Sequence, residues 1–356
     1  MNGISLAART PERFVLARLL QCLSQDSLSP SSATILPFKL AATPVAAMAI
    51  LPLLAESTMC GIVGILIKDP ALRSQLGEFV TPMLVCLDER GPDSAGLAAF
   101  EEHPSADARR ISLFCAAPDF DWASLGQRIC NELDAGARLS PQAASAELVS
   151  SVPVEKLRAW LARHAPQVHA LAVGKSIRVI KDEGRPGDIA RRYRFETLAG
   201  THAIGHTRMA TESAVSPLHA HPFTAGEDFC LVHNGSLSNH HMIRRKLERK
   251  GIRFETDNDS EAACRYLQWR MQEGDALETA IEAAFRELDG FYTLLIATLD
   301  SLVVVRDPFA CKPAVAAETD AYVAVASEYR SLAHLPGIEQ AELFEPAPER
   351  IYAWNV

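Results

Sequence analysis

The chain has 356 residues, of which 48% are hydrophobic and 22% are charged, and its formal net charge is −9. It contains no uninterrupted apolar run of about 18 residues, the length that spans a bilayer, so the sequence predicts no membrane-spanning helix. The negative charge argues against non-specific binding of nucleic acid, and we interpret the basic runs at 191–194 and 244–250 as solvated faces. These properties are typical of a soluble globular protein.

Residues 1–59 differ in composition from the rest of the chain, with a Ser/Pro-rich patch at 27–33 and an apolar stretch at 40–55. A secretory signal peptide fits poorly, because two acidic residues lie in the long segment before the apolar stretch. Three arginines among the first eighteen residues leave an organelle-targeting segment open. We expect instead a removable propeptide or a start codon assigned too early, so that this extension is absent from the mature protein.

From Cys60 onward, short apolar runs alternate with helical patterns. The run CGIVGILIK (60–68) is typical of a buried strand. The next segment has apolar side chains at helical spacing, which predict an amphipathic helix: Leu76, Phe79, Val80, Met83, Leu84 and Leu87.

Further strands and two well-delimited helices follow. The helices are expected at 259–274, with Asp259 as the capping residue, and at 275–290, and each ends at a glycine. Residues 101–200 contain two helix candidates, and we interpret them as an insertion in the same domain. The pattern favours an α+β fold with packed sheets. The expected strands are GLAAF (96–100), HAIGHTRMAT (202–211), DFCLVHNG (228–235), the hairpin FYTLLIATLDSLVVVRD (291–307) and AYVAVASE (321–328).

Eight cysteines are scattered along the chain without a CxxC pair, most of them in apolar surroundings, which favours reduced thiols in the cytosol. A cysteine attacks an amide carbonyl only if a base takes its proton. At a chain terminus the cysteine's own α-amino group, with a pKa near 8, serves as that base. The eight are Cys22, Cys60, Cys86, Cys115, Cys130, Cys230, Cys264 and Cys311.

Six motifs that follow in order from Met59 resemble the class II glutamine amidotransferases, which are N-terminal nucleophile (Ntn) hydrolases. Three later motifs, ELDGFY, RDPFACKP and ASE, are similar to those that close the same domain, and the resemblance covers about residues 59–330. It implies a four-layer αββα sandwich of two antiparallel sheets over 60–356, with a helical insertion at about 101–200. The six motifs are MCGIVGI (59–65), RGPDSAG (90–96), GHTRMAT (205–211), HPF (221–223), HNG (233–235) and TDNDSEAA (256–263).

The resemblance implies a role for each motif residue. Cys60 would attack the side-chain amide of glutamine, forming a thioester and releasing ammonia. The Asn234 side chain and the Gly235 backbone N–H would hold the oxyanion. Arg208 would bind the α-carboxylate of glutamine, and Asp259 would bind its ammonium.

Other motif positions carry weaker implications. Thr211 and His221 would lie beside the glutamine pocket, and Arg90 would help to order it. Several members of the family have tryptophan where this chain has Met209, so the contact over the pocket is expected to differ. Seven histidines lie between 202 and 241, but no HExxH or zinc-ribbon spacing supports a metal site.

The sequence shows no synthase motif that would consume the ammonia. Few residues follow the ASE motif, and no GxxxxGK[ST] or GxGxxG is present. The layout is most similar to the free-standing, glutamate-synthase-type amidotransferase subunit of N-methylglutamate synthase. That resemblance implies a cytoplasmic hetero-oligomer, no cofactor in this chain, and a partner synthase subunit that carries flavin and iron–sulfur clusters.

Two other hypotheses stay open at this point. If the peptide bond before Cys60 is never cut, the chain would be a catalytically silent glutamine-binding or scaffold subunit, since an amide nitrogen cannot accept the proton. The chain could also be an Ntn amidase with another substrate. Arg208 and Asp259 argue against this, because together they suit the two charged ends of an amino acid.

Overall fold

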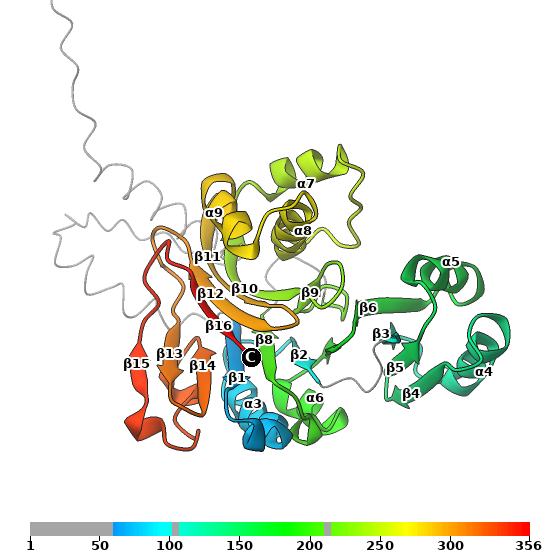
Figure 1. Cartoon of the computed structure of the whole chain (residues 1–356), viewed down its shortest axis with the longest axis horizontal. Coiled ribbons are helices and arrows are strands. Elements are labelled where there is room, and N and C mark those ends of the chain that lie inside the picture. The colour runs from blue at the N-terminus through cyan, green and yellow to red at the C-terminus, as the bar shows by residue number, and fades with distance from the viewer. Residues whose placement is uncertain (1–59, 102–106, 210–214) are drawn as a thin grey trace, which may run out of the picture. The chain divides into compact units, whose positions relative to one another are not determined.

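Two antiparallel sheets form the centre of the fold (Figure 1). A computed structural model describes residues 60–101, 107–209 and 215–356. The predicted extension, 1–59, lies outside the described residues. Within the described residues, no helix is long and apolar enough to cross a membrane.

The first sheet has seven strands among the described residues, and every neighbouring pair is antiparallel. Its central strand, β1, is the apolar run that follows Cys60, and it pairs with β14 on one side and β8 on the other. In spatial order the strands are β15 (Glu342–Phe344), β13 (Val315–Glu318), β14 (Tyr322–Ala326), β1 (Gly61–Ile67), β8 (His202–Arg208), β2 (Ser94–Phe100) and β7 (Ile177–Glu183).

The second sheet lies against the first and has five strands in the described part of the chain. Its β11–β12 hairpin is the one predicted from the sequence. In spatial order the strands are β16 (Tyr352–Asn355), β12 (Ser301–Arg306), β11 (Gly290–Ala297), β10 (Cys230–Leu237) and β9 (Phe223–Thr224).

Strand β1 is apolar on both faces because it separates two cores. Val63, Ile65 and Ile67 pack toward the helices outside the first sheet. Ile62 and Leu66 pack on the other face, against apolar side chains of the second sheet. A strand buried on both faces has no polar alternation, which explains its continuous apolar run.

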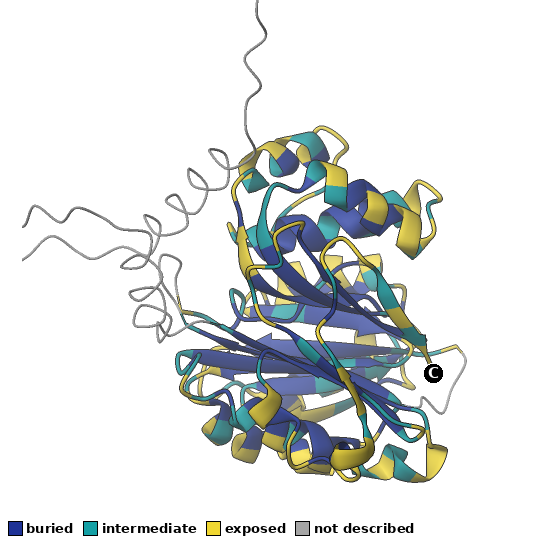
Figure 2. Cartoon of the chain, turned by 90° about the vertical axis from the view of Figure 1, so that its left-hand side faces the viewer, coloured by how far each residue is buried: buried dark blue, intermediate teal, exposed yellow. Residues whose placement is uncertain are grey.

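Helices cover the outer faces of both sheets and complete the four layers (Figure 1). Buried residues follow the sheets and the inner faces of the helices, while the outer faces of the helices are exposed (Figure 2). The αββα sandwich is therefore confirmed. On the first sheet lie α3 (Leu76–Val85) and α6 (Pro186–Arg192), and on the second α7 (His240–Glu248), α8 (Asp259–Gln272) and α9 (Leu277–Glu287); 3-10 turns are η1 (Pro70–Gln75), η2 (Phe195–Thr197), η3 (Tyr329–Ser331) and η4 (Ile338–Gln340).

The insertion at about 101–200 is not simply helical, because it contains a sheet that the sequence analysis missed. Both predicted helices are present, and they pack on a four-stranded sheet around a core of their own. The part beyond Gly174 belongs to the main fold, since β7 joins the first sheet. The elements are β3 (Arg109–Cys115), α4 (Trp122–Glu132), β4 (Arg138–Gln142), β5 (Ser145–Ser150), α5 (Val154–His164) and β6 (Val168–Gly174).

Candidate active site

One cleft brings together residues that are far apart in the sequence. It has a volume of about 440 Å³ and lies where β1, β8 and β10 meet the segment that leads into α8. Five of the seven predicted site residues line it. Of the other two, Thr211 lies outside the described residues, and Asn234 is buried beside Gly235 of the lining. The cleft is lined by Cys60, Arg208, Met209, His221, His233, Gly235, Ser236, His240, His241, Asp257, Asn258, Asp259 and Ser260.

Cys60 is held at the start of β1 through its backbone. Its carbonyl oxygen accepts hydrogen bonds from Nε and Nη2 of Arg90, both at 3.3 Å. Arg90 is fixed in turn by Glu328, whose Oε1 lies 2.5 Å from Nη1. The expected ordering role of Arg90 therefore has a physical basis, because this arginine ties Cys60 to the ASE motif at the end of β14.

The thiol of Cys60 lies in surroundings that favour its neutral form. Burial raises its pKa, and the opposing influences are a hydrogen bond to the Met209 carbonyl and the positive charges of Arg208, Lys312 and Arg90. Sγ lies 3.9 Å from the Met209 oxygen. A thiol with a raised pKa needs a base before it can attack a carbonyl.

Arg208 supplies the positive charge of the cleft. It is the last residue of β8, and only 5% of its surface is exposed. Burial lowers the pKa of its guanidinium, which nevertheless stays a cation at neutral pH. A cation with two parallel donors at the edge of a cleft is well suited to bind a carboxylate.

Asp259 supplies a negative charge to the lining of the cleft. It is not the capping residue of α8. Asn258 is the N-cap, because its side chain accepts from the backbone N–H of Ser260 at 2.8 Å. Asp259 is the first helical residue, and its Oδ2 accepts from the N–H of Leu237 at 2.8 Å. The capping prediction was wrong by one residue, because neighbouring Asn and Asp suit the position equally well.

Asn234 and Gly235 lie inside β10 and do not form the hairpin turn that their sequence also allows. Gly235 has φ 148°, and a Cβ on it would lie 1.9 Å from the Phe291 carbonyl oxygen. The Asn234 side chain is buried, and its Nδ2 donates to no acceptor among the described residues. A buried amide donor without a protein partner is costly, so its position beside the cleft calls for an explanation.

Comparisons with known proteins agree with this geometry. The glutamine amidotransferase domain family matches residues 206–334. The glutamine amidotransferase-like protein GlxB of Rhizobium meliloti is 46% identical over 298 residues, which cover 83% of this chain and 98% of that protein. The chain belongs to the glutamine amidotransferases.

More distant amidotransferases match only in part. The amidophosphoribosyltransferase of Methanocaldococcus jannaschii is 32% identical over 185 residues, which cover 49% of this chain and 39% of that protein. The structure of B. subtilis glutamine phosphoribosylpyrophosphate amidotransferase aligns with a TM-score of 0.54 at 19% identity, over 83% of this chain and 47% of that one. The structural likeness shows that the fold is that of the Ntn hydrolases.

Three buried histidines lie beside the cleft of this amidotransferase. His206 and His221 stack with ring centroids 4.0 Å apart, and the Nδ1 of His233 lies 2.8 Å from the Ser260 hydroxyl. Burial lowers the pKa of all three, so they are neutral at pH 7. Among the described residues, no group of three or more His, Cys, Asp or Glu side chains could hold a metal ion.

Several cleft residues were not predicted as site residues. His233 belongs to the HNG motif and Asp257 to TDNDSEAA, so their motifs could have indicated them. His240 and His241 begin α7, and no local pattern distinguishes them from surface residues. They line the cleft only because the start of α7 packs beside it.

Proposed function

We propose that this amidotransferase hydrolyses the side-chain amide of glutamine through a Cys60 thioester and delivers the ammonia to a separate synthase subunit. The observation that carries the proposal is the lining of one cleft by a thiol, a guanidinium and a carboxylate. Arg208 binds the α-carboxylate of glutamine and Asp259 binds its ammonium, so the side-chain amide extends toward Cys60. His221 borders the bound substrate, and we keep Thr211 as a further binding residue.

The reaction proceeds in two steps. The Cys60 Sγ attacks the amide carbon, and the developing oxyanion accepts hydrogen bonds from Nδ2 of Asn234 and from the Gly235 N–H. The tetrahedral intermediate collapses to a thioester as the C–N bond breaks and ammonia leaves with a transferred proton. Water then hydrolyses the thioester to glutamate. The unpartnered amide of Asn234 supports this role.

The base in this proposal is the α-amino group of Cys60 itself. The raised pKa of the buried thiol calls for a base, and an α-amine with a pKa near 8 matches it. The amine exists only if residues 1–59 are removed, for instance by translation from Met59 and removal of that methionine.

The acceptor of the ammonia is the finer part of the proposal. We infer a cytoplasmic hetero-oligomer with an N-methylglutamate or glutamate synthase subunit that carries flavin and iron–sulfur clusters. The match with GlxB spans 98% of that protein, which supports a free-standing amidotransferase subunit. Co-purification of the complex, with flavin absorbance and iron content measured on the partner, tests this part by itself.

The catalytic part is tested by two measurements on one preparation. Intact mass gives the mature N-terminus, and glutamate release from glutamine is compared between the unsubstituted chain, Cys60→Ala and the control Cys311→Ala, which changes an exposed cysteine. We expect a chain that begins at Cys60, loss of activity in the first variant and full activity in the second. Glutamine hydrolysis by a chain that still begins at Met1 would refute the terminal-amine mechanism.

A further inference from the structure

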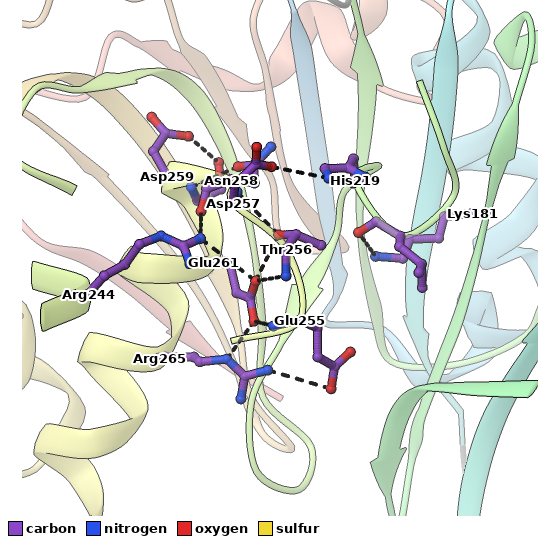
Figure 3. Close-up of polar contacts among 12 residues, drawn as sticks. Lys181, His219, Arg244, Glu255, Thr256, Asp257, Asn258, Asp259, Glu261 and Arg265 are labelled. Atoms are coloured by element: carbon purple, nitrogen blue, oxygen red, sulfur yellow. Dashed lines mark hydrogen bonds and ion pairs between the residues drawn. The ribbon is translucent and has the colours of Figure 1, made fainter. Parts of the chain in front are cut away.

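The segment that leads into α8 separates two cavities. Residues 257–260 line the cleft, whereas Glu255, Thr256 and Glu261 line a second cavity of about 80 Å³ on the side of the insertion. Figure 3 shows the side chains of this segment and their polar contacts. The path of the backbone from 255 to 258 therefore decides which carboxylates reach the cleft.

The carboxylate of Glu261 anchors this segment through hydrogen bonds. Only 2% of Glu261 is exposed, and its oxygens accept from the backbone N–H groups of Glu255 and Thr256, each at 2.8 Å. The Thr256 hydroxyl donates to it at 2.7 Å, and so does Nε of Arg265 at 2.7 Å (Figure 3). A buried carboxylate with four donors is a rigid anchor, because losing its charge would leave several donors without a partner.

This arrangement differs from the usual capping box. Glu261 is the third residue of α8, and a glutamate at that position commonly accepts from the backbone N–H of the N-cap. Here the N–H of the N-cap, Asn258, donates to the Thr256 hydroxyl at 3.2 Å. Glu261 instead accepts from the N–H groups of Thr256 and Glu255, which lie two and three residues before the N-cap. The chain before the helix is thereby folded against the first turn, with Asp257 and Asp259 directed to the cleft.

We propose that Glu261 is a positioning residue for recognition of the substrate's ammonium group. It does not line the cleft, so its effect on recognition passes through Asp259, which directly follows the segment that Glu261 anchors and whose Oδ2 accepts from the N–H of Leu237. This inference rests on the proposed function, in which Asp259 binds the ammonium of glutamine. The chemistry recognised is an α-ammonium group on a substrate that also carries a carboxylate and a primary amide.

The test compares Glu261→Gln with Glu255→Gln. Both changes remove one carboxylate from the same segment, but the Glu255 side chain lines the second cavity and is half exposed. We expect Glu261→Gln to raise the KM for glutamine about 10-fold with kcat changed less than about twofold, because the anchoring hydrogen bonds involve a charge. Glu255→Gln should leave both parameters unchanged.

A second measurement separates positioning from general loosening of the fold. L-Glutamine and glutaramate, the same amide without the α-ammonium, are titrated against Cys60→Ala with and without Glu261→Gln. We expect about 10-fold weaker binding of glutamine and unchanged binding of glutaramate. Equal losses for both ligands, or no loss for either, would overturn the inference.

Failure of the inference is distinguishable from failure of the proposed function. If the unsubstituted chain, beginning at Cys60, neither binds nor hydrolyses glutamine, the proposed function fails. If it does both and Glu261→Gln behaves like Glu255→Gln, only the positioning role fails. Should Glu261→Gln not fold, Thr256→Val decides instead, since it removes one donor to Glu261 together with the acceptor of the Asn258 N–H. A rise in KM of about threefold for Thr256→Val supports the inference, and an unchanged KM refutes it.

Discussion

At the scale of single residues, Asn234 combines burial with a missing partner. Its side-chain nitrogen donates to no acceptor among the described residues, and Gly235 beside it lines the cleft. A donor kept free in this way is arranged for charge that develops during a reaction.

We therefore expect Asn234→Ala to lower kcat for glutamine hydrolysis by about 10²- to 10³-fold with little change in KM, as removal of one oxyanion donor does elsewhere. Steady-state glutamate release measures both parameters. Asn131→Ala, on the surface of the insertion, is the control. A loss confined to KM would show that Asn234 binds the ground state of the substrate instead.

Arg208 gives a second prediction at this scale. Arg208→Lys keeps the charge but removes the planar pair of donors, so we expect the KM for glutamine to rise by about 10- to 100-fold. Arg249→Lys, at an exposed position on the surface, should change nothing. The measurement is the dependence of initial rate on glutamine concentration, and an unchanged KM in Arg208→Lys would exclude bidentate carboxylate binding.

At the scale of elements, the turn between β6 and β7 joins the insertion to the main fold. Asp228, which is buried, accepts from the backbone N–H groups of Lys175, Ser176 and Ile177 at 2.7, 2.9 and 2.9 Å. One carboxylate that lies just before β10 thus holds the turn between strands of two different sheets.

We expect Asp228→Ala to lower the free energy of unfolding by about 2–4 kcal/mol, because three backbone donors, of which that of Ile177 is buried, lose their carboxylate acceptor. Asp228→Asn, which keeps one carbonyl oxygen, should lose about half as much. Urea denaturation gives the free energies, and hydrogen exchange at residues 175–177 should accelerate first. Exchange that accelerates equally across the second sheet would contradict this local role.

At the scale of the whole molecule, imidazoles are enclosed where the two sheets face each other. His202 stacks on Phe100 at 4.2 Å between ring centroids, and its Nε2 lies 2.8 Å from the Thr298 carbonyl oxygen. Burial lowers the pKa of His202 to about 4 and that of His206 to about 3. Packing of the two sheets therefore keeps both rings neutral.

The sign of the pH dependence follows from these lowered values. Below pH about 6.5 the unfolded chain binds protons on these rings while the folded protein does not. For each ring, the free energy of unfolding therefore falls by about 1.4 kcal/mol for every unit by which the pH decreases. For His202 this loss continues down to pH about 4. We expect His202→Gln to flatten the fall in the free energy of unfolding between pH 6.5 and 5, measured by urea denaturation. His241→Gln, at an exposed position, should keep the original slope.

Local patterns were sufficient for most elements and for placing five of the predicted residues in one cleft lining. The apolar run after Cys60 predicted β1, and the helical spacing from Leu76 predicted α3. The sheet of the insertion was missed, and for its edge strand the reason is local: β4 is RLSPQ, which is mostly polar and contains a proline. The cap of α8 was misplaced by one residue, since Asn258 and Asp259 carry the same local signal.

The order of the motifs and the chemical type of each group in the cleft could be known from the amino-acid sequence, because residue identity and spacing along the chain are local properties. The sharing of one cavity by Cys60, Arg208 and Asp259 could not, because it depends on which faces of the sheets and of α8 meet. The pairing of β1 with β8 brings Cys60 and Arg208 to the same end of the first sheet, and the packing of α8 on the second sheet adds Asp259.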